Sequence, residues 1–137
     1  MTSMEAEVRT ALEKFRRGDD ETAFFELIEM PGDVLTGIID VFHAEPCADV
    51  RAFLVKAAWE RREETVIRFL AEALNDPAEQ VWQQALDGLV AFSLPASLKV
   101  LQSARSRKFT EETAAKRFNL WLEEAIQQVE LELRSKA

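Results

Sequence analysis

A repeat with a period of 31 residues is the feature that most limits how this chain can fold. When the sequence is shifted over itself by 31 positions, Pro46 falls on Pro77 and Val50 falls on Val81. The same register matches further pairs of apolar residues: Leu54 with Ala85, Ile67 with Leu98, Leu70 with Leu101 and Ala73 with Ala104. Such periods are typical of chains in which short structural units stack side by side and bury their apolar sides against one another.

The residue types predict that each unit is helical. The chain has four glycines, four prolines and no tyrosine, and it lacks the alternating Val, Ile and Thr pattern of a half-buried strand. Glycine, proline and other turn residues divide the chain into about eight predicted helices, at residues 3–17, 19–30, 33–44, 46–61, 64–75, 77–92, 95–107 and 110–134. Pro46, Pro77 and Pro95 are expected at helix starts, where proline loses no hydrogen bond. Asp76 and Glu79 are expected to form a capping box around Pro77.

These observations predict an all-α protein, a right-handed α-solenoid of about four antiparallel helix pairs that forms one domain over residues 1–137. The units are expected at about residues 7–37, 38–68, 69–99 and 100–130. The two central units match best. The outer two match weakly, as expected for terminal units that cap the stack with a more polar outer face.

The segment FLAEALNDPAEQVWQQALDGLVAFSLPASLKVLQSAR resembles a HEAT repeat. Its first helix ends in leucine, an Asn-Asp-Pro turn follows, and Val81 and Ala85 lie four residues apart on the second helix. The resemblance extends over residues 34–106. Trp82 stands where the family commonly has arginine, whereas Arg51 keeps that arginine one unit earlier, so a ladder of buried Asp/Arg contacts is not expected to run the whole length.

Charge is distributed unevenly along the chain. The net charge is −8, with 19 acidic and 9 basic residues in positions 1–92 but 6 acidic and 8 basic residues in positions 93–137. A phosphate backbone would be repelled by the larger acidic part, whereas a basic protein would be attracted to it. A single cysteine and the lack of a long apolar run near the N-terminus predict a soluble, cytoplasmic protein without a membrane segment.

Residues suited to catalysis or metal binding are scarce. His43 is the only histidine and Cys47 the only cysteine, and Pro46 places them on different helices, so no metal site is expected. The chain has no glycine-rich phosphate loop and no paired nucleophile and base, which predicts a non-enzyme without a cofactor.

A basic cluster is the one feature that suggests phosphate contacts, and it consists of Lys99, Arg105, Arg107, Lys108, Lys116 and Arg117. Some HEAT-like proteins bind DNA on such surfaces. The cluster is short and is interleaved with only two aromatic residues, Phe109 and Phe118, so a solvated helix junction is the favoured interpretation and nucleic acid is disfavoured as a partner.

A partner-binding surface is expected in the central units. Helical-wheel positions place Phe53 and Trp59 at the margins of the apolar stripe, and Trp82 is a third candidate aromatic anchor. The alternative is that these three rings fill gaps between adjacent repeats. The polar and acidic candidates around them are Glu60, Glu63, Asp76, Glu79, Gln80, Gln83, Gln84 and Asp87.

The last predicted helix has an apolar face of its own, formed by Phe118, Leu122, Ala125 and Val129. This face is expected to pack within the stack, with Trp121 sealing the C-terminal end. A homodimer through the same face has no independent support in the sequence.

The resemblance extends to the compact HEAT-like immunity proteins of bacterial polymorphic-toxin and contact-dependent inhibition systems, which are similarly short, acidic and free of catalytic motifs. It implies a protein that binds and neutralises a cognate basic, nuclease-type toxin domain. The alternatives are a general scaffold or assembly adaptor, similar to bilin lyase subunits or chaperone-like partners, and a DNA-binding HEAT-like protein such as a glycosylase.

Overall fold

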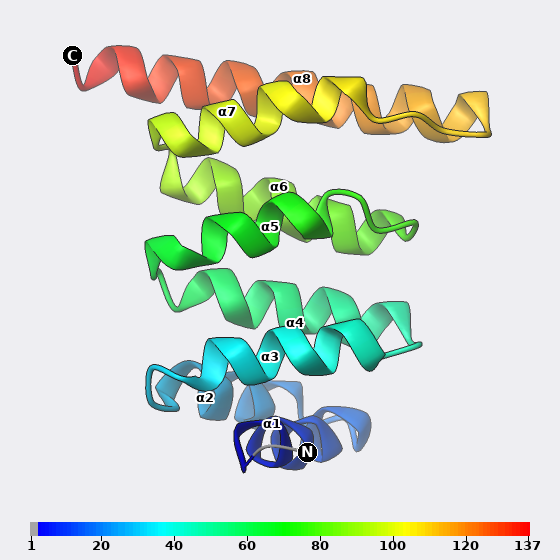
Figure 1. Ribbon diagram of the computed structural model, residues 1–137, viewed down its shortest axis with the longest axis vertical. Helices are drawn as coiled ribbons and strands as arrows, with labels where there is room; N and C mark the ends of the chain where they lie inside the picture. Colours follow the sequence, from blue (N-terminus) through cyan, green and yellow to red (C-terminus); the bar gives the residue numbers. More distant parts are fainter. Residues whose placement is uncertain (1–2) are drawn as a thin grey trace.

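The computed structural model describes residues 3–137, and within them it contains eight α-helices and no strand (Figure 1). The helices are α1 (Ser3–Arg16), α2 (Asp20–Glu29), α3 (Val34–Ala44), α4 (Ala48–Glu60), α5 (Ile67–Ala73), α6 (Glu79–Phe92), α7 (Pro95–Ser103) and α8 (Glu112–Ser135). Single turns of 3₁₀ helix, Glu64–Val66 and Ala104–Ser106, extend α5 and α7. The predicted all-α solenoid is confirmed.

Acidic residues, rather than prolines, organise the turns that precede α4 and α6. The carboxylates of Glu45 and Asp76 accept the backbone N–H two residues further on, at Cys47 (3.0 Å) and Ala78 (2.9 Å). Each helix begins one residue after that N–H, so Pro46 and Pro77 lie before the helices and not at their first positions. The capping box expected around Pro77 is therefore wrong, because Asp76 lies outside α6.

Pro95 does stand at the first position of α7, as predicted. The backbone N–H of Leu94 donates to Ser97 Oγ at 3.2 Å, which satisfies a donor at the start of that helix. The preceding residue Ser93 closes α6 in a left-handed conformation, with φ of 46°. This turn is tight because only two residues, Ser93 and Leu94, separate α6 from α7.

The helices stack in two layers. In Figure 1, α3, α5 and α7 lie in front of α4, α6 and α8, and successive pairs follow one another along the long axis. The helices of the back layer, α2, α4, α6 and α8, are called the second helices below. Helix α2 contacts α4, α4 contacts α6, and α6 contacts α8, so the second helices form one continuous layer.

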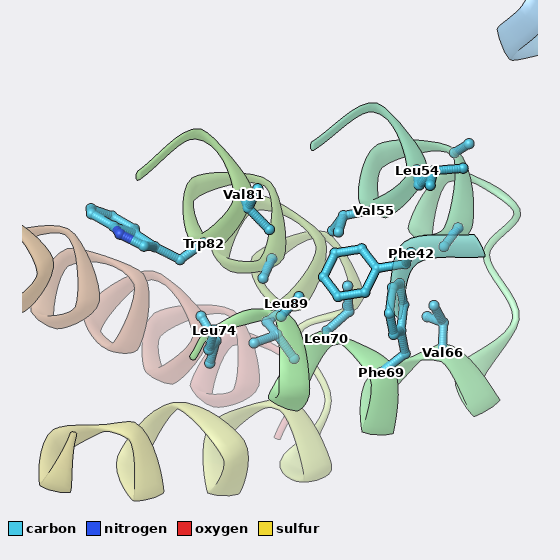
Figure 2. Close-up of a cluster of buried hydrophobic side chains, with 14 of the residues drawn as sticks. Phe42, Leu54, Val55, Val66, Phe69, Leu70, Leu74, Val81, Trp82 and Leu89 are labelled. Carbon is cyan, nitrogen blue, oxygen red and sulfur yellow. The ribbon is translucent and has the colours of Figure 1, made fainter. Parts of the chain in front are cut away.

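The core lies between the two layers. Phe42 of α3 and Phe69 of α5 meet edge to face, with centroids 5.0 Å apart and planes at 89°. Figure 2 shows these two rings beside Leu54, Val55 and Leu70. Edge-to-face pairs of this kind add to the stabilisation that apolar burial supplies.

Helix α8 packs its apolar face inward, as predicted. Phe118, Leu122, Ala125 and Val129 are buried in the core against the preceding unit. This burial corrects the suggestion of a homodimer through the same four residues, because none of them is free to meet a second copy.

Candidate functional site

Large exposed apolar side chains are confined to the second helices. Among residues 3–137 they are Phe25 on α2, which is 51% exposed, and Leu120, Trp121 and Leu131 on α8. The front-layer helices α1, α3, α5 and α7 carry none in the part of the chain that the structure describes. Exposed apolar groups collected on one layer are typical of a surface that binds another protein.

A first hollow, the aromatic hollow, lies between α2 and α4 and has a volume of about 420 Å³. Its lining residues are Asp20, Glu21, Phe24, Phe25, Phe53 and Lys56. Phe53 stacks on Phe15 with ring centroids 4.3 Å apart and meets Phe24 edge to face at 6.4 Å. The Lys56 ammonium lies 5.3 Å from the Phe24 ring centroid, in the range of a cation–π contact. Phe53 therefore forms a half-buried wall, and Phe25 is the more exposed ring.

A second hollow, the tryptophan hollow, lies between α6 and α8 and has a volume of about 270 Å³. Its lining residues are Leu86, Asp87, Val90, Ala91, Trp121, Glu124, Ala125 and Gln128. Trp121 is 39% exposed, so it lines this hollow instead of sealing the end of the stack. Neighbouring protein atoms displace water from the Asp87 carboxyl and raise its pKa above the ordinary value, although the residue remains exposed.

Helices α4 and α6 lie between the two hollows, and their polar side chains contact one another. The indole Nε1–H of Trp59 donates to Gln84 Oε1 at 3.2 Å, and the Gln80 amide donates to Asp49 at 3.1 Å. The guanidinium of Arg62 lies 5.2 Å from the Trp59 ring centroid. Trp59 is half-buried and held in place, so it is a fixed part of this surface.

The remaining candidates occupy different positions. Glu60 and Gln83 are half-buried residues of the second helices, and Glu60 pairs with Arg62 at 3.7 Å. Trp82 is only 3% exposed and meets Phe118 edge to face at 5.1 Å, so it is a core residue and not a partner anchor. Figure 2 shows the Trp82 ring pointing toward α8, between the repeats. The alternative interpretation, that this ring fills a gap, is the correct one for Trp82.

Two further acidic candidates, Glu63 and Glu79, form ion pairs within the chain. The Glu63 carboxylate accepts from Arg61 at 2.8 Å, and the Glu79 carboxylate accepts two hydrogen bonds from Arg117 at 2.6 and 2.8 Å. Arg117 lowers the pKa of the Glu79 carboxyl by these bonds. The acidic surface expected from the sequence is thus weaker at these positions than their number suggests.

Asp76 belongs to a buried ion pair between units. Arg51 Nε donates to one Asp76 oxygen at 2.9 Å and Arg51 Nη2 donates to the other at 3.0 Å, and both side chains are largely buried. This is a single buried Asp/Arg contact, in the unit where the sequence keeps the family's arginine. The pattern changes one unit later, where Arg107 donates to the backbone carbonyls of Leu74 and Asp76 and lies 4.2 Å from the Phe109 ring centroid.

Most of the basic cluster is also engaged within the protein. Arg105 donates to both oxygens of Glu123 at 2.9 and 2.8 Å, Lys116 pairs with Glu112 at 3.3 Å, and Arg107 and Arg117 make the contacts described above. Cations already paired with carboxylates bind phosphate poorly, because the internal partner must first be displaced. Arg105, Arg107 and Arg117 link different elements of the stack, in agreement with the helix-junction interpretation, whereas Lys116 pairs within α8.

The sequence interpretation missed Phe24, Phe25 and Glu124. A signal for the first two exists, since adjacent phenylalanines on a helix are about 100° apart and cannot both enter one core. Glu124 could not be selected among many acidic residues without knowing that α8 places it beside Trp121.

The described residues contain no group of three or more His, Cys, Asp and Glu side chains able to hold a metal ion. His43 contacts Glu72 across adjacent units and is exposed. In residues 3–137, no helix is both long and apolar enough to span a membrane.

Fold and surface together define an α-solenoid with a continuous layer of second helices that carries its exposed apolar groups. A family model for HEAT repeats matches residues 35–116, and the chain belongs to this family. Comparison with curated proteins and with solved structures gives no significant match. HEAT repeats are typically non-catalytic scaffolds that mediate protein interactions.

Proposed function

We propose that this protein is a non-catalytic binding module whose protein partner lies along the second helices, from the aromatic hollow to the tryptophan hollow. The observation that carries the proposal is that the large exposed apolar side chains of residues 3–137 all lie on α2 and α8, the two ends of that layer. Interfaces concentrate binding energy in aromatic side chains that are surrounded by polar residues.

The partner that fits best is a basic protein domain, and we propose an immunity function against a nuclease-type toxin. A net charge of −8, with the excess of acidic residues in positions 1–92, supports this choice. Long-range attraction would speed association with a basic domain, and the aromatic rings would slow its release. A general assembly adaptor is the second candidate, because membership of the HEAT repeat family fits it equally well.

The first step is to determine whether a toxin gene lies immediately upstream of this gene, and the experiment then uses the C-terminal domain of that toxin. Co-expression should protect cells from that domain, and the purified proteins should form a stable complex. Glu60→Lys with Asp87→Lys, both on the second helices, should slow association at low salt and speed dissociation. The matched control is Asp40→Lys with Glu64→Lys, which changes the net charge equally but lies on α3 and the turn before α5.

The two pairs of variants separate general attraction from local contact. Both should reduce the association rate at low ionic strength, by about tenfold, because both remove long-range attraction. Only the first pair should raise the dissociation rate. Absence of a toxin gene and of any protection would leave the adaptor as the remaining candidate, whereas equal dissociation rates for both pairs would move the binding surface away from the second helices.

A further inference from the structure

The tryptophan hollow combines an exposed ring, apolar walls and two carboxylates. Trp121 is the exposed ring, Leu86 and Val90 contribute apolar lining, and Asp87 and Glu124 contribute the carboxylates. The two acids come from different helices, α6 and α8, so the packing of these helices brings them to one hollow.

Neither carboxylate has a cation within ion-pair distance among the residues that the structure describes. Their own helices offer none either. The residues three and four positions away are Gln83, Gln84, Val90 and Ala91 for Asp87, and Leu120, Trp121, Gln127 and Gln128 for Glu124. The nearby acids differ, since Glu79 pairs with Arg117 and Glu123 pairs with Arg105.

Partial desolvation makes the Asp87 carboxylate better disposed to receive a cation. Its raised pKa has burial as its cause, and no basic residue in the part of the chain that the structure describes offsets that cost. Lys136 lines a separate hollow that shares Val90, Ala91 and Gln128 with the tryptophan hollow, and it pairs with Glu132 at 3.9 Å. Among the described residues, the tryptophan hollow therefore carries two carboxylates without a cationic partner.

We propose that the tryptophan hollow receives an arginine side chain of the partner protein, with the guanidinium stacked on Trp121 and paired with Asp87 and Glu124. This inference rests on the proposed function and specifies the chemistry of its partner. Arginine fits better than lysine because its guanidinium is planar, stacks on aromatic faces and is weakly hydrated, whereas an ammonium is compact and strongly hydrated. Its aliphatic stem would lie on the apolar lining.

The test adds N-acetyl-arginine amide to the full chain and follows the three tryptophan indole N–H signals in ¹H–¹⁵N spectra. The signal of Trp121, assigned with Trp121→Phe, should shift and saturate, while that of buried Trp82 should stay in place. The lysine analogue should bind roughly threefold more weakly, and the neutral citrulline analogue should produce no saturable shift.

Matched variants test the two carboxylates. Asp87→Asn with Glu124→Gln should weaken binding of the arginine probe by about tenfold, since two partly exposed pairs are lost. Asp40→Asn with Glu64→Gln makes the same change in net charge away from the hollow and should leave binding within about twofold.

Three results would overturn the inference: an unmoved Trp121 signal, an equal response to citrulline, or equal weakening in both double variants. A stronger response to the lysine probe would also overturn it, since the site would then select an ammonium. If the arginine probe fails while Glu60→Lys with Asp87→Lys still speeds partner dissociation, the arginine site is wrong and the binding surface is retained.

Discussion

At the scale of single residues, the acids that precede Pro46 and Pro77 connect successive units. Glu45 and Asp76 are 31 residues apart, and each accepts both a backbone N–H two residues on and an arginine from an earlier helix, Arg16 or Arg51. The equivalent position one period later is Arg107, where the acid is absent and the arginine itself donates to backbone carbonyls. At all three positions an arginine therefore donates hydrogen bonds to a neighbouring unit. Its acceptor is a carboxylate at Glu45 and Asp76, whereas Arg107 donates to backbone carbonyls.

Replacing Asp76 by alanine should lower the free energy of unfolding by about 3 kcal/mol, because the largely buried Arg51 would lose its ion-pair partner. Urea unfolding followed by circular dichroism measures this change. The control Asp40→Ala, at an exposed position, should stay within about 0.5 kcal/mol. A similarly small effect at Asp76 would show that the pair does not hold the units together.

Asp87→Asn should raise stability at neutral pH. The pKa of the Asp87 carboxyl is raised by desolvation in the folded state, so the unfolded chain releases this proton at lower pH than the folded chain does. Stability is therefore lost as pH rises from the ordinary pKa of the carboxyl to the raised one. The asparagine variant should lose less stability over that range. Thermal unfolding at pH 3 and pH 7 measures the difference, and a variant less stable than the parent at pH 7 would contradict the assignment.

Side-chain exposure was only partly predictable at this scale. Position on the helical wheel separated Gln80 and Asp87, both exposed, from the buried stripe of α6. It could not place Trp82, because that ring is covered by Phe118, which lies on α8 and far along the chain.

At the scale of helices, close packing of α4 against α6 depends on Gly88. A Cβ added there would lie 2.7 Å from Trp59 Cγ and 2.9 Å from both Trp59 Cβ and Leu70 Cδ1, far inside normal contact. The absence of a side chain thus lets the Trp59 ring lie against α6 while its indole N–H reaches Gln84.

Gly88→Ala should destabilise the protein by about 1 to 2 kcal/mol. Overpacking costs about 1 to 3 kcal/mol, and the better helix propensity of alanine offsets up to about 1 kcal/mol. Gly32→Ala is the control, because a Cβ at that position meets no atom within 4 Å. Urea unfolding followed by circular dichroism compares the two variants, and equal stability of both would mean that Trp59 moves aside without cost.

Helix number and order were predictable from the sequence, but two helix starts were not. Proline alone marks the start of α7, and Pro95 was placed correctly. At Pro46 and Pro77 the preceding acid accepts the N–H after the proline, which holds the turn in an extended form and delays the helix. Each of these acids is also held by an arginine 25 to 29 residues earlier, Arg16 or Arg51. A local sequence pattern does not include a contact over that distance.

At the scale of the whole molecule, the period of 31 residues predicted the solenoid because it fixes which apolar faces recur. The binding surface was harder to predict, because free charge depends on pairing between units. Arg117 neutralises Glu79 from 38 residues away, whereas Asp87, on the same helix as Glu79, has no such partner among the described residues. The division into four units with polar caps remains a prediction.

Protection from hydrogen exchange should follow position in the stack. Helices α4, α5 and α6 have neighbours on both sides, since α4 contacts α2 and α6, α5 contacts α4 and α7, and α6 contacts α4 and α8. Helix α8 packs on one side only, and its outer side carries Leu120 and Leu131, which are 64% and 61% exposed. In a solenoid each unit is stabilised mainly by its nearest neighbours, so helices with one neighbour open at lower free energy.

Mass spectrometry of hydrogen exchange should find the slowest amides in α4 to α6 and faster exchange over residues 128–135. Equal protection in these two regions would mean that the chain opens only as a whole, and that contacts between units are stronger than those within them.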